Sequence, residues 1–250
     1  MAWESDYTWV TGDEPPTPSQ VKKAGDRIRR AVEGGGEPSS EDLHLLDVLR
    51  SWHGAIHNEL QLRLGSAISR ERASLPSTDV VITGRPLKTR EAIIAKLVRE
   101  RSRLNRIQDI VGARVVVPDM ATQQAVLEVA LREFAENSPV IAKDTRDAGD
   151  GLGYRGLHVV VLIAGRYAEI QIRTGLQGLW AQVVEKLDEV AGSDLKHGSG
   201  LEETLDWLRA FSERLGRVEH GEKVDTRTAV GTAADSIIAM VALIQKGDQR

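Results

Sequence analysis

The sequence predicts an α+β fold in which a five-stranded sheet is flanked by helices. Two apolar runs, residues 158–163 and 167–172, surround a short turn and predict a β-hairpin. Before them, short apolar runs alternate with helical patterns, which predicts three more strands and two intervening helices. Apolar residues at helical spacing on both sides of this stretch predict helices that pack on the sheet.

The N-terminal 75 residues are predicted to form an arm and two helices. Residues 1–18 are polar and rich in proline, which is typical of an extended arm. Residues 19–32 have a helical pattern that ends at three consecutive glycines. A longer helix follows, because apolar residues keep helical spacing from Leu45 to about Ile68.

Residues 76–192 are predicted to contain the sheet. Besides the hairpin, strands are expected at residues 79–83, 110–117 and 139–143. Residues 84–87 are expected to form a turn, and a helix with a basic flank follows it. A second helix is expected at 120–136, and an acidic loop at 144–153 leads into the hairpin.

The hairpin is expected to bring four polar side chains to one face of the sheet. With the turn at residues 164–165, His158 lies opposite Gln171. Because side chains alternate along a strand, Glu169, Gln171 and Arg173 then share a face with His158. A carboxylate, an amide, a guanidinium and an imidazole together indicate a catalytic or binding surface; a solvated strand face is the alternative.

The C-terminal part is predicted to be helical. The pattern indicates a helix at 175–190, a linker at 192–200, and helices at 201–218 and 228–245. The predicted division is therefore an arm with helices at 1–75, a core at 76–192, and C-terminal helices at 193–250.

Composition excludes several classes of protein. The formal net charge is −4, which argues against binding nucleic acid through overall positive charge. The chain has no cysteine, so disulfides, thiolate metal sites and cysteine nucleophiles are excluded. Because there is no signal-peptide pattern and no apolar run of membrane-spanning length, a cytoplasmic location without membrane contact is expected.

Five short motifs occur in order along the predicted core. They are RPLKT at 85–89, IQDIVGAR at 107–114, GYRGLH at 153–158, EIQIRT at 169–174 and WA at 180–181. In this order they resemble the synthetase domain of the RelA/SpoT family, in its small single-domain form. The resemblance implies a mixed sheet of nucleotidyltransferase-like type, and an enzyme that moves the β,γ-pyrophosphate of ATP to a ribose 3′-hydroxyl.

The resemblance also implies a Mg²⁺ cofactor held by Asp109 and Glu169. Mg²⁺ prefers one or two carboxylates together with phosphate and water oxygens, so two acidic side chains from separate strands suit it. Glu169 is in addition expected to accept the proton of the attacking hydroxyl. For Asp109 the alternative is a cap at the entry of a strand.

The ATP-binding residues follow from the same motifs. Arg85 and Arg114 are expected to hold the adenine between their guanidinium planes. Lys88, Lys96 and Arg99 are expected to bind the ATP phosphates.

The resemblance also implies a set of acceptor-binding residues. Tyr154 resembles the aromatic residue on which the acceptor base stacks. His158, Gln171 and Arg173 are expected around the acceptor ribose and phosphates.

Three features depart from the family pattern. Two residues instead of one separate Arg85 from Lys88, and Lys186 stands where the family usually has histidine. The loop at 144–153 carries three aspartates where the family usually has a lysine suited to phosphate.

The favoured acceptor is GDP or GTP, which would give (p)ppGpp, the signal of the stringent response. The loss of a phosphate-binding lysine weakly favours an alternative, toxin-like pyrophosphorylation of the tRNA 3′ CCA end, for which a neutralising antitoxin would be the partner. A third alternative is an inactive nucleotide-sensing module. Small members of the family are often multimers, so a homo-oligomer is a further expectation. The chain has no His-Asp dipeptide, so no hydrolase activity is expected.

Overall fold

The computed structural model describes residues 15–85, 87–147, 149–191, 195 and 202–222. Most of the expected N-terminal arm, nearly all of the linker at 192–200 and the helix expected at 228–245 lie outside the described residues. No helix within these described ranges has the length and apolar character needed to cross a membrane.

A mixed sheet forms the centre of the molecule, and the predicted fold class is confirmed. Its strands are β1 (Val81–Arg85), β2 (Gly112–Val117), β3 (Val140–Asp144), β4 (Leu157–Ile163) and β5 (Arg166–Thr174). Their order in space is β1-β2-β5-β4-β3. The β2–β5 pair is parallel, and the other neighbouring pairs are antiparallel.

The β4–β5 hairpin has the predicted register. His158 pairs with Gln171, and residue 160 pairs with Glu169. Ala164 and Gly165 at the turn have φ values of 49° and 70°. Two successive residues with positive φ are typical of the tight turns whose twist matches that of antiparallel strands.

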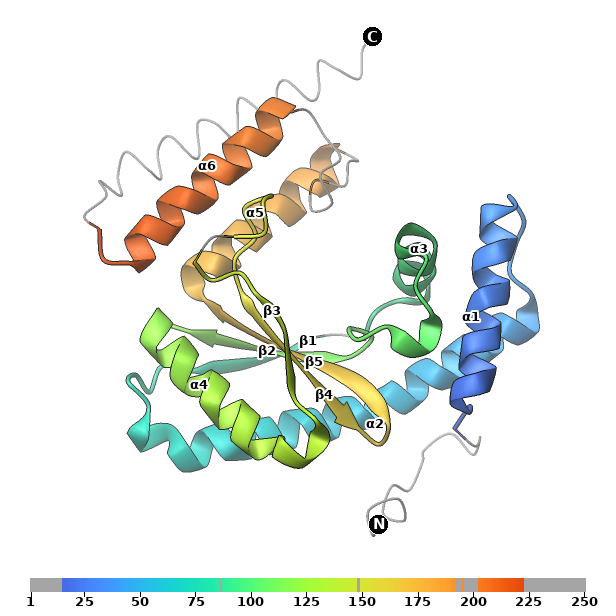
Figure 1. Ribbon diagram of the computed structural model, residues 1–250, viewed down its shortest axis with the longest axis horizontal. Coiled ribbons are helices and arrows are strands. Elements are labelled where there is room, and N and C mark those ends of the chain that lie inside the picture. Colours follow the sequence, from blue (N-terminus) through green and yellow to red (C-terminus); the bar gives the residue numbers. More distant parts are fainter. Residues whose placement is uncertain (1–14, 86, 148, 192–194, 196–201, 223–250) are drawn as a thin grey trace.

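One face of the sheet is covered by α2 (Ser40–Glu71) and α4 (Met120–Glu133), as Figure 1 shows. Every second residue of β2, namely Ala113, Val115 and Val117, is buried in the apolar core formed with these helices. The remaining residues of β2 therefore belong to the opposite face, on which the polar side chains lie.

A second apolar cluster joins α1 (Pro18–Glu33) and α3 (Arg90–Glu100) to the N-terminal half of α2. A capping box at Thr17 begins α1. At Gly25 a Cβ atom would lie 2.5 Å from Leu104 Cβ, so glycine permits the close approach of α1 to this segment.

A third cluster joins α5 (Gly175–Ala191) and α6 (Glu202–Glu219) through Trp180, Val184 and Leu208. Helix α5 contacts β5 and β2. In Figure 1, α5 and α6 lie at the upper left, and α3 and α1 lie apart from them at the right.

Three short 3-10 helices complete the described elements: Arg72–Ser74, Leu104–Arg106 and Ala135–Asn137. The predicted turn at 84–87 begins later than expected, because Gly84 and Arg85 pair with β2 and extend β1. Strand β2 begins two residues later than predicted, at Gly112; the carbonyl of Ile110 accepts a hydrogen bond from the amide of Lys88 instead.

His53 is buried inside α2 and is held neutral. It is 3% exposed, and its Nδ1 lies 2.7 Å from the carbonyl of Leu49, to which the neutral ring donates. Burial lowers the pKa of His53 from 6.5 to about 4. Because the unfolded chain takes up a proton at higher pH than the folded chain, stability from this residue is complete above about pH 6.5 and is lost as the pH falls through about 4.

We therefore expect His53→Gln to reduce the acid sensitivity of folding. Between about pH 7 and about pH 4.5 the parent chain should lose on the order of 2 kcal/mol more unfolding free energy than the variant. Urea unfolding at both pH values measures this difference. His44→Gln, an exposed histidine of the same helix, is the control; an equal pH dependence in the parent and the His53 variant would contradict the expectation.

Candidate functional site

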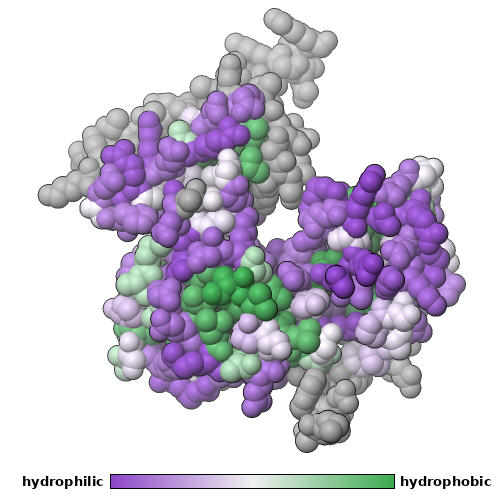
Figure 2. All heavy atoms as spheres, viewed as in Figure 1, coloured by the Kyte–Doolittle hydropathy of each residue, from purple (hydrophilic) through white to green (hydrophobic). Residues whose placement is uncertain are grey.

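A cavity of about 460 Å³ lies beside the polar face of the sheet, where the β strands, the start of α3 and α5 meet. Figure 2 shows the molecule hollowed between the part formed by α5 and α6 and the part formed by α1 and α3. Its lining consists of Arg85, Lys88, Lys96, Asp109, Arg114, Lys143, Asp150, Tyr154, His158, Glu169, Gln171, Arg173, Trp180, Ala181 and Glu185.

The polar face of the hairpin is enclosed. Glu169, Gln171 and Arg173 are 8%, 4% and 7% exposed. A solvated strand face, the alternative interpretation of this pattern, is therefore wrong. Buried polar groups need hydrogen-bond partners inside the protein. The hairpin register supplies one, because it places His158 opposite Gln171 and close to Glu169.

A glycine brings the two carboxylates to the same end of the sheet. Gly112 begins β2 and pairs with Glu169. A Cβ at this position would lie 2.5 Å from the carbonyl oxygen of Glu169, so only glycine allows this approach. Asp109 precedes Gly112 by three residues and reaches the same cavity as Glu169.

The carboxylate of Glu169 accepts hydrogen bonds at both oxygens. Oε1 accepts from Nδ1 of His158 at 2.6 Å, and Oε2 accepts from Nε2 of Gln171 at 2.8 Å and from Arg85. Burial raises the pKa of Glu169, but His158, Arg85 and Gln171 outweigh it and hold the pKa at about 2. Glu169 is therefore ionised at neutral pH, and Nε2 of its partner His158 shares a hydrogen bond with the hydroxyl of Tyr154.

Asp109 is neutralised by two lysines. Nζ of Lys88 donates to Oδ2 at 2.7 Å, and Nζ of Lys96 donates to Oδ1 at 2.9 Å. Burial raises the pKa of Asp109, but the hydrogen bonds and charges of Lys88 and Lys96 outweigh it and lower the pKa to about 2. The carboxylate of Asp109 does not cap the entry of a strand, because both of its oxygens accept hydrogen bonds from lysine side chains.

Tyr154 lies at the cavity wall, and two cationic side chains lie over its ring. Nζ of Lys143 is 4.5 Å from the ring centroid, and Cζ of Arg173 is 4.9 Å from it. The ring also makes an edge contact with Trp180 at 5.9 Å. Burial raises the pKa of Tyr154, so its hydroxyl stays protonated at neutral pH.

The lining carries an excess of positive charge. Six of its side chains are lysine or arginine, and four are carboxylates. Nε of Arg114 and Nε of Arg173 are buried and have no hydrogen-bond partner among the described residues. Burial and the nearby charges of Arg173 and Arg85 lower the pKa of Arg114. An anionic ligand would relieve this repulsion and satisfy the open donors.

The structure brings together ten of the eleven residues that the sequence assigned to a site. The eleventh, Arg99, lies outside the lining and donates to Glu100 at 3.2 Å. Sequence analysis missed Lys143 as a site residue. Lys143 pairs with His158 across β3 and β4, and paired residues share a face of the sheet. A correct prediction of this pairing would therefore have placed Lys143 beside the site.

The acidic loop is less repulsive than its composition suggests. Of its three aspartates, Asp150 alone lines the cavity, and it accepts from Lys143 at 2.8 Å. Asp144 is paired with Arg146 at 2.7 Å. The third, Asp147, lies 3.6 Å from Nε2 of His220.

The residues present fit a metal ion that enters with a nucleotide. The described residues contain no cluster of three or more His, Asp or Glu side chains that could hold a metal by themselves. Mg²⁺ usually takes one or two carboxylates and obtains its other ligands from phosphate and water. Asp109 and Glu169, on the wall of one cavity, match that limited requirement.

Part of the sequence matches a family model, and most of it aligns with uncharacterized relatives. Residues 84–188 match the model of the region found in RelA/SpoT proteins. Uncharacterized proteins of Mycobacterium bovis and Mycobacterium tuberculosis are 31% identical over 173 residues, which is 68% of this chain and 60% of theirs. The chain thus spans about 60% of the length of these curated relatives.

Solved structures share the fold. Small alarmone synthetase 1 of Bacillus subtilis, bound to its product pppGpp, has a TM-score of 0.54 at 23% identity and covers 67% of this chain and 89% of its own. Small alarmone synthetase 2 of the same organism has a TM-score of 0.54 at 21% identity, covering 69% and 92%. A GTP pyrophosphokinase family protein from Streptococcus pneumoniae has a TM-score of 0.52 at 22% identity, covering 75% and 92%.

Proposed function

Because residues 84–188 match the model of the region found in RelA/SpoT proteins, we propose that the chain transfers the β,γ-pyrophosphate of ATP to the ribose 3′-hydroxyl of GDP or GTP. The observation that carries the proposal is the cavity itself. Two ionised carboxylates, Asp109 and Glu169, lie on its wall among six cations, two of which keep an unpaired buried donor. Phosphoryl transfer needs positioning and charge neutralisation more than covalent chemistry, and this lining provides both.

Asp109 and Glu169 would hold Mg²⁺ brought by the nucleotide. When bound, the ion neutralises phosphate charge and aligns the phosphates for in-line displacement. The protein's own part is to keep both carboxylates ionised, which the low pKa of each secures at neutral pH.

Glu169 is also the proposed acceptor of the hydroxyl proton. A carboxylate with a pKa of about 2 is a weak base while its donors remain in place. Transfer of Arg85 from Glu169 to the nucleotide would remove one positive charge and raise the pKa of the carboxylate. The ion pair of Arg85 with Glu169 would therefore be exchanged when ATP binds.

ATP and acceptor would occupy opposite ends of the cavity. The predicted ATP residues Arg85, Lys88, Lys96 and Arg114 come from β1, the segment before α3, α3 itself and β2. The predicted acceptor residues come from β4, β5 and the loop before β4, and Lys143 joins them. Lys143 is paired with Asp150 in the described structure, and an acceptor phosphate would compete with Asp150 for it.

The experiment incubates the chain with Mg²⁺, γ-labelled ATP and, separately, GDP, GTP or deacylated tRNA. We expect label on GDP or GTP together with release of AMP. Label on tRNA alone would replace the acceptor with the tRNA 3′ end and support the toxin-like alternative. Label on none of them would overturn the proposed activity and leave a nucleotide-sensing module.

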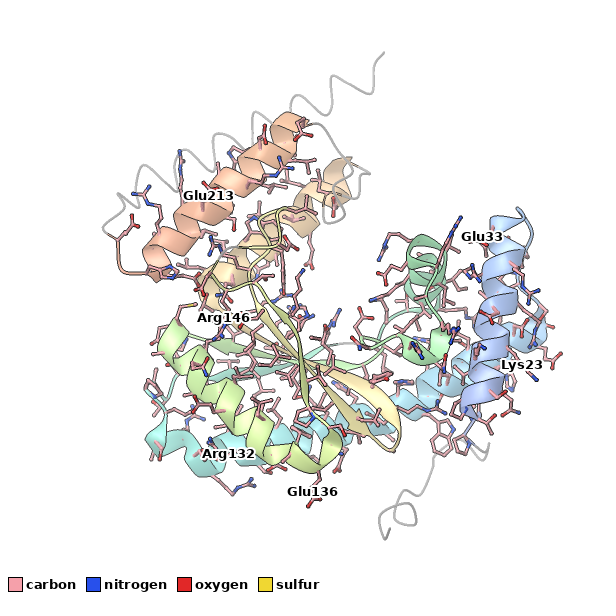
Figure 3. The ribbon with its side chains drawn as sticks, viewed as in Figure 1. Lys23, Glu33, Arg132, Glu136, Arg146 and Glu213 are labelled. Carbon is pink, nitrogen blue, oxygen red and sulfur yellow. The ribbon has the colours of Figure 1, made fainter. Side chains whose placement is uncertain are left out.

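Glu169→Gln should lower the rate of transfer by about 100-fold or more, because the amide can neither bind Mg²⁺ as a carboxylate nor accept the proton. Initial rates of label transfer measure this, and circular dichroism checks the fold. Glu136→Gln, on the far side of the sheet as labelled in Figure 3, is the matched control and should keep full activity. A fully active Glu169 variant would remove Glu169 from the mechanism.

Tyr154→Ala should raise KM for the acceptor about tenfold or more and leave KM for ATP nearly unchanged, because stacking of one base on an aromatic ring contributes about 1–3 kcal/mol. Tyr154→Phe keeps the ring and loses the hydrogen bond to His158, so it separates stacking from hydrogen bonding. Equal effects on both values of KM would place Tyr154 outside the acceptor subsite.

A further inference from the structure

The loop that carries Tyr154 is held by a helix that lies outside the matched family region. This loop, which the structure describes at residues 145–147 and 149–156, connects β3 to β4. Helix α6 begins at residue 202, whereas the family match ends at residue 188. One buried arginine of the loop, Arg155, contacts both the loop backbone and α6.

The guanidinium of Arg155 bridges both ends of the loop and α6. It is 7% exposed, and its Nη1 donates to the carbonyl of Arg146 at 2.8 Å and to that of Asp147 at 2.5 Å. Its Nε donates to Oγ of Ser212 at 3.1 Å, and Ser212 donates in turn to the carbonyl of Gly153. The oxygens that accept hydrogen bonds from Arg155 are neutral, so these bonds crosslink the loop backbone and the helix.

A glycine in α6 makes the space for this guanidinium. A Cβ at Gly216 would lie 2.6 Å from Cζ of Arg155 and 2.7 Å from its Nη2. Glycine in a helix interior is unfavourable relative to alanine, so the position gains nothing for the helix itself. Its use is the close packing of Arg155 against the helix backbone.

Further contacts fix the loop between α6 and α4. Nε of Arg209 in α6 donates to the carbonyl of Gly151 in the loop at 3.0 Å. Helix α6 is itself held by α5, because Nε1 of Trp180 donates to the carbonyl of Leu208 at 3.1 Å. On the opposite side, Arg146 donates to Oε1 of Gln124 in α4 at 2.9 Å. Figure 3 labels Arg146 beside α4, with the end of α6 above it.

We propose that Arg155 is a positioning residue through which α6 sets the place of Tyr154 in the acceptor subsite. This rests on the proposed function, since it assigns Tyr154 to the acceptor. A guanidinium removed from water is stable only while its donors are satisfied, so the loop conformation and the docking of α6 stabilise each other. Binding of an acceptor at Tyr154 and docking of α6 are then thermodynamically linked, and a change that displaces Arg155 weakens acceptor binding from a distance.

The test compares Gly216→Ala with Glu213→Ala in the full chain. The Cβ added by Gly216→Ala should displace the guanidinium of Arg155. Glu213 is the control because it is exposed on the same helix, as labelled in Figure 3, and has no contact with the loop among the described residues. Amide hydrogen exchange should become about tenfold faster in the loop of the Gly216 variant and stay unchanged in β4 and β5. Ser212→Ala removes the hydrogen bonds of Ser212 with Arg155 and Gly153 without adding volume. It should give a smaller change in the exchange of the same amides.

The kinetic arm measures KM for each substrate. Gly216→Ala should raise KM for the acceptor about tenfold while KM for ATP changes less than about twofold, and Glu213→Ala should change neither. Loop exchange that stays at the parent rate in both the Gly216 and Ser212 variants overturns the proposal, as does an equal rise throughout β4 and β5 or an equal rise in both values of KM. If the parent chain labels no acceptor, the proposed function fails, and the exchange measurement still decides whether Arg155 positions the loop.

Discussion

The buried carboxylate of Glu169 is the constraint on which the arrangement of the cavity depends. At 8% exposure it can remain ionised only if protein donors replace water. Those donors come from three strands: Arg85 from β1, His158 from β4 and Gln171 from β5 itself. A shift of one residue in any of these pairings would turn the side chains to the apolar face. The sheet register and the charge of Glu169 therefore stabilise each other.

The sequence predicts most of this sheet because its signals are local. Alternation of apolar and polar residues determines the two faces of β5, and the turn at Ala164 and Gly165 then determines the partners of Glu169 and Gln171. The parallel β2–β5 pairing is not local, but Gly112 is compatible with the close approach that it needs. The cavity-lining residues of the hairpin were predicted for this reason, whereas Arg114 of β2 was assigned from the family resemblance.

The residues that the sequence did not assign depend on contacts between distant segments. Lys143 becomes a site residue only because β3 pairs with β4, across a loop whose acidic composition suggested a different role. Arg155 lies in a recognisable motif, yet its partner Ser212 is 57 residues away in a helix for which the motif gives no information. Arg99 was grouped with Lys88 and Lys96 by helical spacing, but side-chain exposure to a cavity depends on the neighbouring elements as well as on the helix.

In the described structure the two carboxylates proposed to hold the metal are each paired with cations of the cavity. Lys88 and Lys96 neutralise Asp109, and Arg85 neutralises Glu169. Under the proposed function, ATP phosphates would take up these cations, and the carboxylates so released would have to find a new counter-charge in a largely buried setting. A divalent cation arriving with the nucleotide would supply it, whereas a nucleotide alone would leave Asp109 without its lysines and Glu169 without Arg85. Under the proposed function this geometry would favour binding of nucleotide and metal together over binding of either alone, and the ion pairs of both carboxylates would be exchanged when ATP binds.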